Sequence, residues 1–422
     1  MNRTLHLIAL FIGFIPTSIF ARSGQVSQRV ISLKERGVPF QRIALMDPVP
    51  ASMVTDALWD KALSKAVVIE PRGSELVDLV SGGPRYMALE LPVDGGVLVL
   101  DLIRTEISTA DFKLNLASGT AVQYRSGAHY RGMVRGRPGS VAAISIFEHE
   151  VMGLFNDNEN EWVLGRLDGG DGKKHVLYRS RDLRGRNPFV CSTIDDGEPY
   201  RSEQLTQQSG DRTTRCVRYY WEVNHNVFLD KGDVPNTTNY VTGLFNQSAV
   251  LFDNDGIDVT LSEMFIWDVP SPYTGPGSGD YLTQFGVERT SFNGDMAHLL
   301  GYGGGGGVAW LNTLCNGQTR LRMAYSSINS SYSNVPTYSW SVEVVTHEQG
   351  HNLGSRHTHA CSWNGDGTAI DGCGPTAGYS EGSCPVGPIP SSTVKGTIMS
   401  YCHLVSGSAS ISTMVSALNP RP

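Results

Sequence analysis

Four of the chain's 11 histidines lie in the stretch THEQGHNLGSRHTH, residues 346–359, beside a single carboxylate. His347 and His351 are four residues apart, so a helix would bring both onto one face. Two imidazoles placed in this way can share one tetrahedral zinc ion. Gly354 permits the positive φ that ends a helix, and the chain beyond it can return His357 as a third ligand. The spacing therefore predicts a zinc site whose fourth position is open to water.

Glu348 follows His347 directly and lies at the rim of this predicted site. Zinc lowers the pKa of a bound water toward about 7, so hydroxide is available at neutral pH. Glu348 is the expected general base toward that water, and later the acid that protonates a leaving amine. His359 has no ligand spacing, and we expect it to be a solvated loop residue.

The string HEQGHNLGSRH, followed by GTIMSY at 396–401, resembles the metzincin metalloproteases. In that clan Met399 would form the Met-turn beneath the zinc ligands. The segments DMAHLLGYGGGGGVAWLNTLC and VRYYWEVNHNVF resemble the adamalysin (reprolysin, ADAM-type) branch, and HYRGMVRGRPGSVAAIS at 129–145 resembles its prodomains. The resemblance implies a β-rich prodomain and then an α+β catalytic domain, with a mixed twisted sheet, an active-site helix and an irregular lower subdomain.

Two positions depart from the adamalysin pattern. Thr358 stands where that branch usually has Asp, and Tyr401 follows Met399 at the spacing of the astacin and serralysin branches. In those branches the tyrosine binds zinc at rest and can hydrogen-bond the transition-state oxyanion. The resemblance extends this role to Tyr401, and the alternative is a packed aromatic ring. The strand that matches the calcium site of some adamalysins lacks the acidic residue, so structural calcium has no support in the sequence.

The cysteine count is odd, and six of the seven cysteines lie in the C-terminal half: Cys216, Cys315, Cys361, Cys373, Cys384 and Cys402. These six can form three disulfides, which leaves Cys191 unpaired. A thiolate is a strong zinc ligand, and at the fourth position it would exclude water, as in the cysteine switch of metalloprotease propeptides. The alternative is a free buried thiol or a mispaired bridge. The adamalysin resemblance implies a Cys315–Cys402 bridge, and the other pairings stay open.

The N-terminus indicates export. A basic residue, Arg3, precedes a short apolar run at 5–15, and the small residue Ala21 closes the segment. This order predicts a signal peptide at 1–21, too short for a membrane anchor, and a secreted or periplasmic protein. We expect a prodomain at 22–205, a polar linker within 187–214 and a catalytic domain at 206–422. The mature enzyme would begin within 202–216, and Arg201, Arg212 and Arg215 are the candidate cleavage sites.

Periodicity predicts the elements that must position the site. Alternation and the turns DGG and NDNEN favour hairpins within 86–107 and 139–167. In the C-terminal half we expect strands at 216–228, 257–268, 307–315 and 320–328, and helices at 237–256, 281–289, 294–301 and 336–354. The glycine run at 303–307 is expected to be a flexible turn, and the basic run at 173–186 a solvated strand and turn.

Net charge is −7 and no dense basic cluster occurs, which argues against nucleic acid as a partner. The best-supported function is a secreted zinc-dependent endopeptidase made as a zymogen. It would act on proteins or peptides aligned along the edge strand at 307–315. The alternatives are a secreted binding or adhesion protein on a metalloprotease-like scaffold, and a zinc amidase. The sequence leaves the substrate, the cleavage preference and the oligomeric state open.

Overall fold

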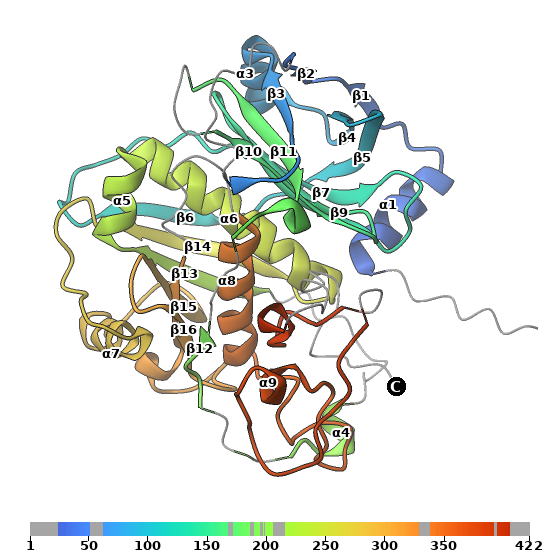
Figure 1. Cartoon of the computed structure of the whole chain (residues 1–422). Coiled ribbons are helices and arrows are strands. Elements are labelled where there is room, and N and C mark those ends of the chain that lie inside the picture. Colours follow the sequence, from blue (N-terminus) through green and yellow to red (C-terminus); the bar gives the residue numbers. More distant parts are fainter. Residues whose placement is uncertain are drawn as a thin grey trace, which may run out of the picture.

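The computed structural model describes residues 24–50, 62–167, 172–185, 190–194, 197, 199–205, 216–328, 338–391 and 395–405. Two sheets with helix α6 between them form its framework (Figure 1). The predicted signal peptide, much of the predicted linker, Arg212 and Arg215 lie outside the described residues. No helix within these ranges is long and apolar enough to cross a bilayer.

The N-terminal half builds a ten-stranded sheet in the order β1-β4-β5-β7-β8-β9-β10-β11-β3-β2, antiparallel except where β1 meets β4. Its strands are β1 (Gln41–Ile43), β2 (Met46–Pro48), β3 (Val67–Pro71), β4 (Tyr86–Val93), β5 (Gly96–Arg104), β7 (Ala128–Val134), β8 (Val141–Ile146), β9 (Val151–Asn156), β10 (Glu161–Arg166) and β11 (His175–Arg179). Both predicted hairpins are confirmed. Gly95 (φ 84°) turns β4 into β5, and the NDNEN turn joins β9 to β10.

A seven-stranded sheet carries the C-terminal half, in the order β12-β16-β17-β15-β13-β14-β6. All pairs are parallel except β16 with β17. Its strands are β6 (Ser108–Leu116), β12 (Val190–Cys191), β13 (Val217–Val223), β14 (Val259–Ile266), β15 (Met296–Gly301), β16 (Gly306–Ala309) and β17 (Met323–Ser327). Both edge strands, β6 and β12, therefore come from the N-terminal half.

The helices of the C-terminal half cover this sheet. The described α-helices are α1 (Gln25–Glu35), α3 (Gly73–Gly82), α4 (Ser202–Leu205), α5 (His225–Lys231), α6 (Val234–Asn254), α7 (Ser278–Glu288), α8 (Tyr338–Asn352) and α9 (Cys373–Thr376), with short 3₁₀ turns η2 (Ser180–Asp182), η3 (Thr319–Leu321) and η4 (Cys402–Leu404). Helix α6 begins where Asp233 accepts a hydrogen bond from the Asn236 N–H at 2.7 Å, with Pro235 in the first turn.

Three expectations for the C-terminal half are wrong. The segment 294–301 is not a helix but strand β15, because a strand between two parallel neighbours is buried on both faces and shows no alternation. The strand expected at 307–315 covers only Gly306–Ala309, and turns follow it. Of the glycine run, Gly304 and Gly305 form the turn at positive φ, but Gly306 and Gly307 belong to β16.

The basic run at 173–186 is also less solvated than expected. Its first part is β11, in which His175, Val176, Leu177 and Tyr178 are all buried. Val176 and Tyr178 pack into one hydrophobic cluster and Leu177 packs into another, so both faces of the strand are covered. Only the residues beyond the strand keep the exposed character that the charges predict.

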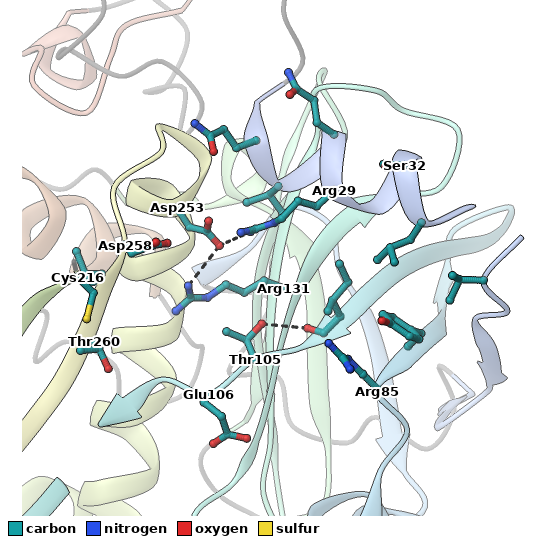
Figure 2. A pocket seen from close by; sticks show the side chains of 18 of the residues that line it. Arg29, Ser32, Arg85, Thr105, Glu106, Arg131, Cys216, Asp253, Asp258 and Thr260 are labelled. Carbon is teal, nitrogen blue, oxygen red and sulfur yellow. Dashed lines mark hydrogen bonds and ion pairs between the residues drawn. The ribbon is translucent and has the colours of Figure 1, made fainter. Parts of the chain in front are cut away.

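Helix α6 joins the two halves in one hydrophobic core. It contacts β7, β8 and β9 on one side and α8 and β14 on the other, and side chains of both halves form a single buried cluster. Figure 2 shows the polar end of this contact, where Arg29 and Arg131 converge on Asp253 beside a cavity of about 1030 Å³. The N-terminal half thus shares the core of the region that carries the histidines.

Candidate metal centre

Helix α8 presents His347, Glu348 and His351 at its C-terminal end. The helix ends because Gly354 adopts φ 105°, and its N–H bonds to the His351 carbonyl at 2.9 Å. The chain then turns back and brings His357 against the helix. All three imidazoles are buried, with at most 1% of each residue exposed.

The three Nε2 atoms point at one another. The distances are 3.1 Å from His347 to His351, 3.1 Å from His347 to His357 and 3.2 Å from His351 to His357. Two nitrogen ligands of a tetrahedral zinc ion, each about 2.0–2.1 Å from it, lie about 3.3 Å apart. The three nitrogens therefore already have the separation that a shared zinc ion requires.

Cys191 completes a four-atom cluster. Its Sγ lies 3.4 Å from the His351 Nε2, and its thiol and the three imidazoles offer ligand atoms that all lie within 4.8 Å of one another. Three nitrogens and one sulfur form a ligand set that suits zinc. Burial holds the pKa of His347 and His351 well below its ordinary value and lowers that of His357 to about 3, so these imidazoles stay neutral, as metal binding requires.

Strand β12 carries Cys191 along the edge of the seven-stranded sheet. It runs parallel to β16, and the Ser192 N–H donates to the Gly307 carbonyl at 2.9 Å. A Cβ on Gly306 would lie 2.0 Å from the Val190 carbonyl oxygen, so only glycine allows this approach. The segment therefore lies on the edge that the sequence assigned to substrate.

Glu348 is fully buried beside this segment. Its Oε2 lies 3.6 Å from the Cys191 Sγ and accepts a hydrogen bond from the Thr193 hydroxyl at 3.2 Å. Its Oε1 has no hydrogen-bond partner among the described residues. Burial raises the pKa of the Glu348 carboxyl to about 8, although the contacts with Cys191 and Thr193 lower it. The N-terminal half therefore contacts both the histidine cluster and the neighbouring carboxylate.

Met399 and Tyr401 lie beneath the cluster. A Cβ on Gly350 would be 2.7 Å from the Met399 Sδ, so the thioether packs directly against helix α8. The Tyr401 hydroxyl does not bond to the imidazole nitrogens. It lies 3.2 Å from both the backbone N and the backbone O of Cys191, accepting from the first and donating to the second. In this state Tyr401 anchors β12.

His359 differs from the expectation. It is 2% exposed and stacks on His357, with ring centroids 5.1 Å apart and planes at 12°. The prediction of a solvated residue was wrong because Tyr401 and Glu381, remote in sequence, enclose the ring. Glu381 itself was missed: its Oε1 lies 2.7 Å from the His357 Nδ1, and nothing in the local sequence marks it.

The disulfides also correct the sequence analysis. All seven cysteines are described, and the bridges are Cys361–Cys384 and Cys373–Cys402. The implied Cys315–Cys402 bridge is wrong, because Cys402 is buried in η4 against α9 while Cys315 is exposed in the turns after β16. Cys216 and Cys315 are unpaired, so three thiols are free rather than one, and the parity argument for Cys191 fails. The position of Cys191 at the cluster is independent of that count.

Comparison with known proteins identifies the region that carries the cluster. Residues 213–411 match the family model Reprolysin_5, metallo-peptidase family M12. Among solved structures, metalloproteinase-II from Bacteroides fragilis is similar, with a TM-score of 0.37 and 13% identity over 65% of this chain and 82% of that chain. That score is too low to carry an argument, and the family match covers residues 213–411, less than half of the chain. M12 metallopeptidases are zinc-dependent and act on proteins or peptides, which agrees with the donor set of the cluster.

Proposed function

We propose that the chain is a zinc-dependent endopeptidase whose metal is held by His347, His351 and His357. The observation that carries the proposal is the convergence of three neutral Nε2 atoms, 3.1–3.2 Å apart, beside a buried carboxylate. The family match over 213–411 supports the same activity. A scaffold used only for binding or adhesion would not need Glu348 at this position.

The chain's own residues supply the remaining chemistry. Bound zinc provides a Lewis acid that polarises the scissile carbonyl and acidifies water. Glu348 takes a proton from the attacking water and returns it to the leaving amine. Once β12 is removed, β16 becomes an edge strand beside Glu348, and substrate backbone pairs with it. Met399 supports the ligands from beneath, against Gly350.

We further propose that the chain is made as a zymogen, with residues 22–205 as its prodomain. Cys191 would supply the fourth ligand to a metal held by the three imidazoles, and Thr193 bonds to Glu348, the proposed general base, at 3.2 Å. Strand β12 covers the edge where substrate would pair. Cleavage within 202–216 separates this segment from the catalytic domain, 206–422. Tyr401, which now bonds to the backbone of Cys191, is then free to turn toward the transition-state oxyanion.

The proposed enzyme is exported after removal of residues 1–21. Two disulfides within 361–402 support an oxidising compartment, where such bridges persist. The name of the matched family model also supports the reprolysin branch. Thr358, which stands where that branch usually has Asp, bonds to the carboxylate of Asp371, so an acidic side chain still lies beside the third ligand.

The test of the proposed function is the Glu348→Ala variant. After cleavage within 202–216, the wild-type protein should hydrolyse casein in a chelator-sensitive manner, and the variant should lose activity by about 100-fold or more. Zinc content should stay at one ion per chain, because Glu348 is not a ligand. Retained hydrolysis, or loss of zinc in this variant, would contradict the assigned role. Zinc binding without hydrolysis by the wild-type protein would favour the scaffold alternative.

A further inference from the structure

The three imidazoles of the cluster differ in how their second nitrogen is held. The Nδ1 of His347 lies 2.8 Å from the Ile398 carbonyl oxygen, and the Nδ1 of His351 lies 2.7 Å from the Ser355 carbonyl oxygen. The Nδ1 of His357 lies 2.7 Å from a carboxylate oxygen of Glu381. Among the described residues, a side-chain carboxylate therefore holds the Nδ1 of His357, whereas backbone carbonyls hold the Nδ1 atoms of His347 and His351.

Glu381 is directed at this histidine. Its side chain is 21% exposed, and its Oε1 lies between the His357 Nδ1 and, at 3.8 Å, the His359 Nε2. His359 stacks on one face of the His357 ring, and Glu381 contacts the edge of the ring at Nδ1. A carboxylate that accepts from Nδ1–H keeps the proton there, leaves Nε2 free for the metal and makes it more basic.

The loop that carries Glu381 is fastened by a disulfide. Cys361 and Cys384 are bridged across 23 residues, and the Cys361 N–H donates to the Glu381 carbonyl at 3.1 Å. Gly382 adopts φ 88°, and a Cβ there would lie 2.7 Å from the Cys361 Sγ. The backbone of Glu381 and Gly382 therefore lies directly on the bridge.

We infer that Glu381 is a positioning residue for the third metal ligand and that the Cys361–Cys384 bridge acts on the metal through it. The inference rests on the proposed zinc site. An oxidised bridge holds the loop, the loop holds Glu381, and Glu381 fixes the tautomer and orientation of His357. Zinc retention then depends on the redox state of a disulfide that contributes no ligand.

Zinc affinity of the full chain, measured by competition with a chelator, tests the first link. Glu381→Ala should weaken zinc binding by about 10–100-fold, the usual effect of losing such a partner. Glu381→Gln should recover part of the affinity, because its amide oxygen still accepts from Nδ1–H. Asp366→Ala, which removes an exposed carboxylate of the same subdomain, is the matched control and should bind as wild type. Wild-type affinity for Glu381→Ala, or no recovery with Gln, would overturn the inference.

A spectroscopic readout separates positioning from a general loss of structure. The Nδ1-bound proton of His357 should give a strongly deshielded NMR signal in the wild-type protein. Glu381→Ala should lose this signal, and the corresponding signals of His347 and His351 should remain. Disappearance of all three would mean that the site had come apart, which would contradict a specific effect on His357.

The second link is tested with the bridge removed. Cys361→Ser combined with Cys384→Ser should weaken zinc binding in the wild-type background but add little in the Glu381→Ala background, because both changes remove the same support. Full additivity would overturn the coupling. His357→Ala separates this inference from the proposed function: if it loses zinc while Glu381→Ala does not, only the inference fails. If His357→Ala also keeps wild-type affinity, the proposed site itself is wrong.

Discussion

The N-terminal half contacts the C-terminal half in several places, and two of these contacts differ in kind. The first is broad and lies far from the histidines. Strand β6 pairs with β14, and the ten-stranded sheet packs on α6, where Met152 lies against Gly243. Asn246 bonds across this contact to Tyr130, Ile144, Ser145 and Arg131.

The second contact is narrow and lies at the histidines. It consists of β12, only two residues long, with Cys191 on the cluster and Thr193 on Glu348. We propose that the broad contact holds the fold and that the narrow one blocks the site. A substitution in one should leave the other intact, and the predictions below test this separation.

Asn246→Ala should have the largest effect on stability. The substitution leaves the buried Arg131 Nε without its acceptor and removes the amide's bonds to the Tyr130 and Ile144 carbonyls, so the free energy of unfolding should fall by about 3 kcal/mol. Chemical denaturation measures it. Asn115→Ala, which removes an exposed amide on β6, is the control and should change stability by less than about 1 kcal/mol. Equal effects would show that the broad contact does not hold the fold.

Cys191→Ala should affect activity rather than stability. Without the thiol, β12 loses its hold on the metal and should leave the substrate edge more often, so the uncut chain should hydrolyse casein at least about 10-fold faster than uncut wild type. The free energy of unfolding should change by about 1 kcal/mol or less, because the broad contact that holds the fold is unchanged. Rates are compared at equal zinc content. A variant as silent as wild type, or one that unfolds, would contradict the separation of the two contacts.

Two buried histidines, one in each sheet, should lower the free energy of unfolding at acid pH. His129 bonds to Ser145 at 2.9 Å in the larger sheet, and His298 bonds to Ser326 at 2.8 Å in the smaller one. Burial lowers the pKa of each to about 3, whereas the unfolded value is about 6.5. Below pH 6.5, unfolding therefore takes up protons at these two histidines. Their contribution to the free energy of unfolding is complete above pH 6.5 and is lost as the pH falls toward 3.

Replacement of either histidine sharpens the comparison of the two sheets. His129→Gln and His298→Gln should each flatten the pH dependence by up to about 1.4 kcal/mol per pH unit, the effect of one proton. Because the halves share one core, each variant should alter the same single unfolding transition. Two separate transitions, each sensitive to one of the variants, would show that the broad contact does not couple the sheets.

Arg29→Ala should have the smallest effect. Arg29 pairs with Asp253 across the broad contact, but its side chain is 46% exposed, whereas that of Arg131 is 7% exposed. Exposed pairs contribute about 1 kcal/mol or less and weaken with salt. Thermal unfolding at low and high ionic strength measures the difference. A loss comparable to that of Asn246→Ala would mean that the rim of the contact, rather than its buried centre, supplies the stability.

Local spacing made the centre of the site predictable. His347, Glu348 and His351 lie on one helix, and Gly354 marks its end, so their relation follows from helical geometry alone. The same is true of α6, whose cap and apolar stripe are continuous in the sequence. The β4–β5 hairpin needed only its turn residues.

Contacts between remote segments could not be predicted in this way. Glu381 reaches His357 from a loop held by a disulfide whose pairing the sequence leaves open. His359 is buried by residues that only the folded chain brings together, and β6 crosses from one half to complete the sheet of the other. Strand β15 resembled a helix because burial on both faces removes the alternation that identifies a strand.

The central claim is that three imidazoles and the Cys191 thiolate hold one metal ion in the uncut chain. Zinc X-ray absorption of the purified uncut protein tests it most directly. The account predicts one zinc per chain, with three nitrogens at about 2.0–2.1 Å and one sulfur at about 2.3 Å, and loss of the sulfur in Cys191→Ala. Protein without zinc, or a zinc shell that lacks the imidazoles or the sulfur, would contradict it.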